Sequence, residues 1–168
     1  MAPLVVRFST ADLPEHERAP ILREVVGRTF VRLELEPVTG IPLHWEMVAR
    51  AWPELTVTRS FCSQIRLTRT PQLMADGNDD VVLCLSPEAG QRISHLGRDC
   101  ILDANTAVLL SLSDPTEATT AHLSRCTTIS VPRKALTGTV PKLEDTLARE
   151  LPKTEALQLL KSYIGILG

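Results

Sequence analysis

The sequence predicts a mainly β fold, an antiparallel sandwich or barrel with one helix before it and further helices after it. Three patterns indicate this fold class. Over residues 31–131 apolar and polar residues alternate, as they do in strands that turn one face to a core. This stretch divides into about nine or ten short segments, which is typical of sandwiches and barrels. On both sides of it, apolar residues recur at helical spacing instead.

The helix before the strands is predicted to cover residues 14–28. Ser9 or Asp12 can accept backbone N–H groups at its start, and Pro14 suits a first helical turn. Its apolar stripe consists of Leu22, Val25, Val26 and Phe30.

The expected strands follow in order, and two of their connections have clear turn signals. Pro71 to Met74 should form a short helical turn, and Leu96–Gly97 should be the turn of a hairpin, because glycine accepts a positive φ. A short first strand, LVVRF, is expected before the helix. The expected strand segments after it are VRLELEP, LHWEMVARA, LTVTRSFC, IRLTRT, VVLCLS, the two arms of GQRISHLGRDCIL, TAVLLSL, EATTAHL and CTTISVP. Helices return at residues 132–168. Since no linker or repeat divides the chain, residues 1–168 are predicted to form one domain.

Composition excludes several classes of function. The net charge of −2 and the pI near 6.1 give no basic footprint for nucleic acid, so any DNA contact should come from residues outside this chain. The N-terminus lacks the pattern of a signal peptide, and no apolar run is long enough to span a membrane. A cytoplasmic location is therefore expected.

Cysteines and histidines give no motif for catalysis or metal binding. The four cysteines have no CxxC spacing and are expected to be reduced, mostly buried thiols rather than a redox or metal site. The histidines stand alone in separate segments, although two of them could still converge across a barrel. We therefore expect no metal, no cofactor and no catalytic residues. The residues concerned are Cys62, Cys84, Cys100, Cys126, His16, His44, His95 and His122.

Strand alternation also suggests a ligand pocket. In LHWEMVARA, the apolar face carries Trp45 and Met47, and the same odd-numbered positions in LTVTRSFC carry Arg59 and Phe61. If these four side chains point inward, Arg59 is a candidate to bind a carboxylate or phosphate bidentately. The alternatives are that a bulge or the sheet rim turns Arg59 to water and that Trp45 belongs to the ordinary core.

The last helix has an apolar stripe that is wide for one small barrel to cover. Its residues either pack on the barrel of the same chain or pair two subunits in a symmetric dimer. The candidate interface residues are Leu157, Leu160, Tyr163, Ile164 and Leu167.

Several phrases of the chain together resemble the N-terminal regulatory domain of AraC/XylS-type bacterial transcription regulators. These are FSTADLPEHERAPILREVVGRTFVRLELEP, RTPQLMADGNDDVVLCL, GRDCILDANTAVLLSLSDP and ISVPRKAL. The resemblance extends over essentially the whole chain and implies a cupin-like barrel, or jelly roll, whose C-terminal helices pair two subunits. It further implies a domain that senses a small effector, while a separate C-terminal domain with two helix-turn-helix units, absent from this chain, binds DNA.

Three functions are compatible with these observations. The first is an effector-sensing and dimerising domain that works by binding without catalysis. The second is a metal-dependent cupin-type enzyme, which would need a cluster of histidine and carboxylate ligands. The third is a structural dimerisation module without a ligand, which a barrel interior filled by side chains would favour.

Overall fold

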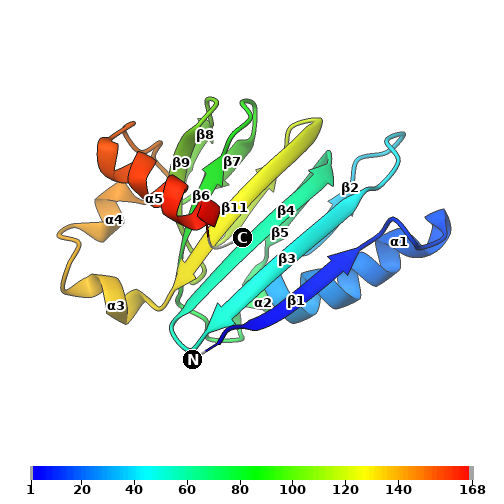
Figure 1. Ribbon diagram of the computed structural model, residues 1–168, viewed down its shortest axis with the longest axis horizontal. Helices are drawn as coiled ribbons and strands as arrows, with labels where there is room; N and C mark the ends of the chain where they lie inside the picture. The colour runs from blue at the N-terminus through cyan, green and yellow to red at the C-terminus, as the bar shows by residue number, and fades with distance from the viewer. Residues whose placement is uncertain (1, 167–168) are drawn as a thin grey trace.

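The computed structural model describes residues 2–166, except for the side chains of residues 30 and 31, and consists of two antiparallel sheets packed face to face (Figure 1). The six-stranded sheet has the order β1 (Leu4–Ser9), β3 (Trp45–Trp52), β4 (Leu55–Ser63), β11 (Leu123–Val131), β6 (Val81–Ser86) and β9 (Thr106–Ser111). The five-stranded sheet has the order β2 (Glu34–Pro37), β5 (Ile65–Arg69), β10 (Thr116–Thr119), β7 (Arg92–His95) and β8 (Arg98–Ile101).

The space between the two sheets is filled by apolar side chains. One cluster joins Cys84, Val108 and Leu110 of the six-stranded sheet to Ile93 and Ala118 of the five-stranded sheet. The other cluster lies toward β1 and β3, where the N-terminal helix also contributes to it. Both clusters are on the inner face of the six-stranded sheet, so the opposite, outer face is left for the C-terminal elements.

The N-terminal helical segment covers the inner side of β1 and β3. It consists of α1 (Glu15–Ile21) and the π-helix η1 (Leu22–Val31), and so ends three residues beyond the expected range 14–28. Gly27 permits this packing, because a Cβ atom at its position would lie 2.7 Å from the backbone oxygen of Leu33. Arg32 then adopts a left-handed φ of 52° and ends the helix, which is why β2 begins at Glu34 rather than at residue 31.

The predicted hairpin turn at Leu96–Gly97 joins β7 to β8. Both residues have positive φ, 53° and 69°, as in a two-residue turn that matches the twist of its strands. A second two-residue connection, Pro53–Glu54, joins β3 to β4, whose end residues Trp52 and Leu55 are paired. The predicted short helix is also present, as α2 (Pro71–Met74), where the Thr70 hydroxyl accepts the N–H of Leu73 at 3.3 Å.

The C-terminal part contains less helix than the sequence suggests. After α3 (Arg133–Thr137) and the one-turn α4 (Leu143–Thr146), the chain becomes extended and lies along β9. There Ala148 and Leu151 donate backbone hydrogen bonds of 2.8 Å to Leu109 and Ala107. This extended segment closes the β9 edge of the six-stranded sheet, whereas no described strand pairs with the outer edge of β1.

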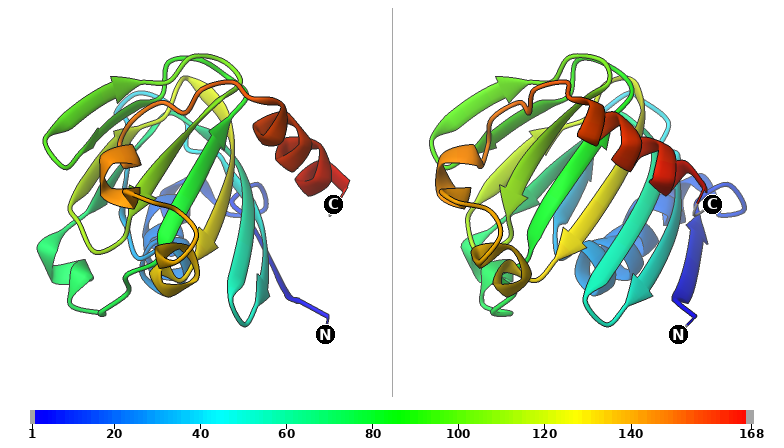
Figure 2. Two further views of the ribbon diagram at one scale, coloured as in Figure 1. Left: turned by 90° about the vertical axis from the view of Figure 1, so that its left-hand side faces the viewer. Right: turned by 60° about the vertical axis from the view of Figure 1, so that its left-hand side comes forward.

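The last element, α5 (Glu155–Ile166), crosses the outer face of the six-stranded sheet (Figure 2). It is therefore on the side opposite to α1, and it leaves the outer face of β1, β3 and most of β4 without a covering helix (Figure 1). None of the described helices is long and apolar enough to cross a membrane.

Candidate functional site

Helix α5 is held on the sheet by an apolar contact. Leu157 and Ile164 are 8% and 5% exposed, and they pack with Val57, Leu85 and Ile129 of the outer face. Residues 157 and 164 are separated by two helical turns and therefore share one side of the helix. The helix and the sheet thus form the two walls of any space between them.

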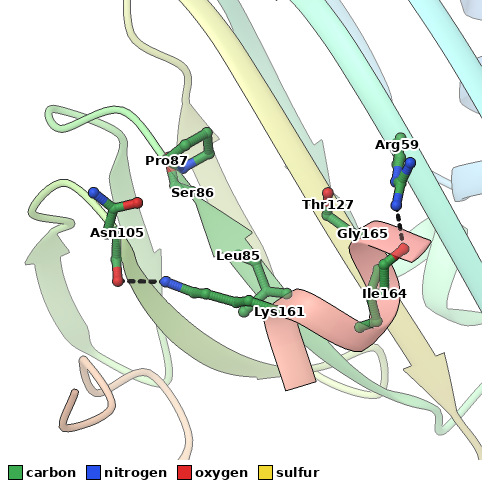
Figure 3. Close-up of a pocket in the computed structure, with 9 residues that line it drawn as sticks. All are labelled: Arg59, Leu85, Ser86, Pro87, Asn105, Thr127, Lys161, Ile164 and Gly165. Atoms are coloured by element: carbon green, nitrogen blue, oxygen red, sulfur yellow. Dashed lines mark hydrogen bonds between the residues drawn. The ribbon is translucent and has the colours of Figure 1, made fainter. Parts of the chain in front are cut away.

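A groove of about 290 Å³ lies between the C-terminal half of α5 and the sheet (Figure 3). It is lined by Arg59, Leu85, Ser86, Pro87, Asn105, Thr127, Lys161, Ile164 and Gly165. Two cations are in this lining and no carboxylate is. A volume of this size lies at the lower end of the range for small-molecule sites.

Both cations of the groove donate to backbone carbonyl groups. The guanidinium of Arg59, on β4, donates through Nη2 to the carbonyl of Ile164, in the last turn of α5. The ammonium of Lys161, on α5, donates to the carbonyl of Asn105, in the loop before β9 (Figure 3). Partial burial and, to a smaller extent, repulsion by Lys153 lower the pKa of Lys161. Neither cation is paired with a carboxylate among the described residues.

A second groove, of about 260 Å³, begins on the other side of Arg59 and extends over the uncovered sheet face. Phe61 and Arg125 both line it, with the guanidinium carbon of Arg125 over the Phe61 ring, 5.3 Å from its centre. Arg125 also pairs with Glu88 at 3.2 Å. Arg59 is common to both grooves and so lies at the centre of the candidate site.

The expectation that Arg59 and Phe61 share a face with Trp45 and Met47 is wrong. Across the β3–β4 hairpin, Met47 is paired with Ser60 and Val48 with Arg59. Paired residues of antiparallel strands point to the same face, and the two-residue turn pairs odd-numbered with even-numbered positions. Arg59 and Phe61 are therefore on the outer face, while Trp45 and Met47 are on the inner one.

Trp45 and Met47 belong to the core, at 5% and 3% exposure. The indole Nε1 of Trp45 nevertheless has no hydrogen-bond partner, and the same holds for the buried Gln91 Oε1 and Ser124 Oγ. Trp45 and Ser124 are both paired with Cys62, so they lie on the same inner face. These polar atoms are distributed within a packed core, and the cavities described above are on the outer face.

The predicted dimer residues divide into two groups. Leu157, Leu160 and Ile164 pack on the sheet of their own chain, as the first alternative for this helix expected. Tyr163 is 62% exposed, and Leu167 lies outside the described residues. Two residues not predicted from the sequence, Leu159 and Ile166, are 71% and 82% exposed and form one outward stripe with Tyr163.

Lys161 and Arg125 also belong to the candidate site and were not predicted from the sequence. The spacing of Lys161 could have indicated its position. Lys161 follows Leu157 by four residues and precedes Ile164 by three, which places it on the sheet-facing side of the helix. Arg125 alternates in phase with Ile129 of β11, but its proximity to Arg59 depends on the pairing of β4 with β11. That pairing joins strands more than 60 residues apart in the chain.

The histidines lie apart from one another. His16 and His122 are exposed, His44 lies 3.2 Å from Glu46, and His95 is buried at 1% exposure. Among residues 2–166, no group of three or more His, Cys, Asp or Glu side chains is placed to hold a metal ion.

All four cysteines are free thiols that point into the space between the sheets. Burial raises the pKa of Cys62 to about 12 and, less strongly, that of Cys100. The neighbouring Cys84 thiol and burial raise the pKa of Cys126 well above its ordinary value. A raised pKa lowers the thiolate fraction of a cysteine and so makes it a poorer nucleophile and metal ligand.

The family model of the AraC-binding-like domain matches residues 22–164, from η1 through α5. The chain belongs to this family. The match includes every strand except β1 and contains both Arg59 and Lys161 of the groove. It confirms the relation to AraC-type regulators inferred from the sequence.

Comparison with solved structures extends this result to the fold. The AraC-like transcriptional activator CuxR superposes with a TM-score of 0.79 at 18% identity, over 96% of this chain. The present chain covers 60% of CuxR. A EutQ protein of Salmonella typhimurium LT2 is much more distant, with a TM-score of 0.42 at 13% identity over 59% of this chain and 79% of that one. No protein with a curated description matches the chain. The superposition on CuxR and the two packed antiparallel sheets confirm the predicted mainly β fold with flanking helices.

Proposed function

We propose that the chain is the effector-sensing and dimerising domain of an AraC-type transcription regulator, and that it acts in the cytoplasm by binding rather than by catalysis. Its membership in the AraC-binding-like family supports a regulatory ligand-binding role. The similarity of its fold to CuxR, an AraC-like transcriptional activator, supports the same role. DNA would be bound by a separate domain.

The hydrogen bond from Arg59 to Ile164 carries the proposal for the effector site. It joins β4 to the last turn of α5 across 105 residues of sequence, at a point where two grooves meet. A ligand bound there contacts the rigid sheet and the helix at once. Its affinity consequently depends on whether α5 is docked, which is the requirement for a ligand to shift a two-state equilibrium.

In this mechanism the sheet is the fixed part and α5 is the moving part. The helix is attached through one apolar side and a few polar contacts. The effector changes the balance between a docked and a released α5, and the helix passes that change to whatever follows it in the regulator. The coupling between ligand binding and helix docking depends on the hydrogen bond from Arg59 to Ile164 and on the apolar contact that Leu157 and Ile164 make with the sheet.

A ligand screen combined with hydrogen exchange tests the effector site. The wild-type protein would be screened by thermal shift against sugars, sugar phosphates, nucleotides and dicarboxylates. A ligand of this site raises Tm and slows exchange in residues 155–166, and Arg59→Gln weakens both effects, while the matched variant Arg66→Gln, on the other sheet, retains them. A ligand that protects only the sheet interior would move the site to the region of Trp45, and an absence of any binder would favour the ligand-free module.

The dimerising role rests on the outward stripe of α5. Leu159, Tyr163 and Ile166 are more than 60% exposed on one side of a helix whose other side is already packed. A second copy that presents the same stripe would cover it around a two-fold axis. Sedimentation velocity at micromolar concentration should show a dimer that Leu159→Glu dissociates, whereas Ile101→Glu, which alters an exposed apolar residue of β8, should leave it intact. A monomeric wild-type chain would contradict this role.

A further inference from the structure

The outer face of the six-stranded sheet concentrates positive charge in a chain whose net charge is −2. Strand register places four arginines on this face, one from each of four adjacent strands. Arg59 of β4 and Arg7 of β1 are in line, since both are paired with Val48 of β3. Arg50 and Arg125 are diagonal neighbours of Arg59, because they are paired with Val57 and Phe61 of the same strand.

Few acidic groups neutralise this charge. Glu46 is on the same face of β3, and Glu88 pairs with Arg125. Among the described residues, no carboxylate forms an ion pair with Arg7, Arg50 or Arg59. A face of this kind attracts anions and raises their local concentration near the groove.

The groove under α5 is the place on this face where an anion can be enclosed. Arg59 and Lys161 both belong to its lining (Figure 3). Thr127 lines it too, and because it is paired with Arg59 its side chain points to the same outer face. The two cations now donate only to neutral carbonyl oxygens. Hydrogen bonds from cationic donors to an ionised acceptor are roughly twice as strong as those to a neutral one.

We propose that the groove between α5 and the sheet binds a small phosphorylated ligand, whose phosphate group is held between Arg59 of β4 and Lys161 of α5. A phosphate carries close to two negative charges at neutral pH and offers three acceptor oxygens, so it can serve both cations and a hydroxyl together. Because one cation belongs to the sheet and the other to the helix, the bound phosphate fastens α5 to the sheet. This inference deepens the proposed function and rests on it.

The volume of the groove limits the remainder of the ligand. About 290 Å³ accommodates a phosphate with a small organic group. Leu85, Pro87 and Ile164 give this part of the ligand an apolar surface. A sugar phosphate or a mononucleotide fits this description, whereas a large polymeric anion would be confined to the open sheet face.

The test uses inorganic pyrophosphate and glucose 6-phosphate as probes, with glucose as the uncharged control. Isothermal titration at low salt should detect binding of both phosphates and none of glucose. Arg59→Gln and Lys161→Gln should each weaken binding about tenfold or more, the usual loss for one hydrogen bond to a charged group. The matched variants Arg66→Gln and Lys134→Gln remove exposed cations elsewhere and should bind as the wild type does.

Two further variants keep the test decisive if a glutamine variant is unstable. Arg59→Lys and Lys161→Arg retain the charge and should bind within a few-fold of the wild type. Hydrogen exchange of residues 155–166 should slow when either phosphate is added. Equal losses in all four glutamine variants would show general charge attraction and overturn the proposal, as would unchanged binding in Lys161→Gln. The proposed effector site would survive both results if an uncharged compound still protected α5.

Discussion

The imidazole of His95 joins the two sheets at one end of the sandwich. It is carried by β7 of the five-stranded sheet, and its Nε2 accepts the backbone N–H of Ser111, in β9 of the six-stranded sheet, at 3.2 Å. The other nitrogen, Nδ1, lies 2.7 Å from the Thr116 hydroxyl and 3.1 Å from the Pro115 carbonyl. Only the neutral ring can accept at Nε2, so the contact depends on the ring remaining unprotonated.

Acid should therefore destabilise the protein through this residue. Burial is the main cause that lowers the pKa of His95 below its ordinary value of 6.5, although the Pro115 carbonyl partly opposes it. At a pH between the lowered pKa of His95 in the folded protein and its ordinary value in the unfolded chain, the unfolded chain binds a proton that the folded protein does not. Stability therefore falls as the pH drops below about 6.5, by at most about 1.4 kcal/mol per pH unit.

Urea unfolding at neutral and mildly acidic pH measures this effect. In His95→Gln the loss of stability on acidification should be smaller than in the wild type, even though the variant starts from a lower stability. His122→Gln, in which an exposed histidine is replaced, should keep the wild-type slope. An identical slope in all three proteins would assign the acid sensitivity to other groups.

At the scale of single residues, sequence alternation predicted burial better than it predicted direction. Trp45 and Met47 are buried as their pattern indicates, because alternation within one strand is local. The direction of Arg59 depends on the turn between two strands, and one residue of register reverses it. The burial of Arg69 was not predictable from its own strand. Its guanidinium forms an ion pair with Asp76 at 2.8 Å and donates a hydrogen bond to the Arg32 carbonyl, and both partners belong to other segments of the chain.

Among the elements, the N-terminal helix shows how one glycine allows a helix to lie close to the backbone of the segment that follows it. Gly27 of η1 is buried, and the carbonyl oxygen of Leu33 occupies the space in which a side chain would begin. Leu33 also donates a hydrogen bond to the helix, from its backbone N–H to the carbonyl oxygen of Gly27 at 3.0 Å. The helix end and β2 are thus fixed to each other at this glycine.

Replacement of Gly27 by alanine should be destabilising despite the better helix propensity of alanine. The new methyl group has to displace backbone, which typically costs about 1–3 kcal/mol. Gly138 is the control, because its φ is −88° and no atom lies within 4 Å of its Cβ position. Gly138→Ala should be neutral or stabilising by up to about 1 kcal/mol. Thermal unfolding of both variants beside the wild type gives the comparison, and a harmless Gly27→Ala would contradict the packing.

Helix ends and strand ends were the least predictable parts of the elements. Residues 142–150 have helical spacing, yet the chain leaves the helix at Leu147. The reason is tertiary: residues 148–151 hydrogen bond to the open edge of β9, and this gain outweighs local helical preference. The turn at Leu96–Gly97, by contrast, is determined locally and was predicted at the right residues.

For the molecule as a whole, the periodicity change at both ends of the chain was enough to predict a mainly β fold. Short alternating strands close together in sequence have few ways to bury their apolar faces, and two packed sheets are the common solution. The assignment of strands to the two sheets was not predictable from the pattern. It joins β1 to β3 and β6 to β9, so that the groove at Arg59 and Lys161 appears only in the assembled molecule.

The whole protein should be insensitive to metal removal. The described residues hold no cluster of metal-binding side chains, whereas a bound metal would stabilise the folded state by mass action. Incubation with EDTA, and separately with added Zn²⁺ or Fe²⁺, should not move Tm by more than about 1 °C. A clear decrease with the chelator, or metal retained through purification, would favour the metal-dependent enzyme.

The two edges of the six-stranded sheet also matter for work with this protein. The edge at β9 is occupied by the chain itself, whereas no strand among residues 2–166 pairs with the outer edge of the six-residue strand β1. A nanobody loop or a split reporter that presents an extended strand could add to the sheet at β1. Because β3 separates β1 from β4, where α5 makes its Arg59 contact, such a crystallisation chaperone or fluorescent handle would leave the groove under α5 open to ligand.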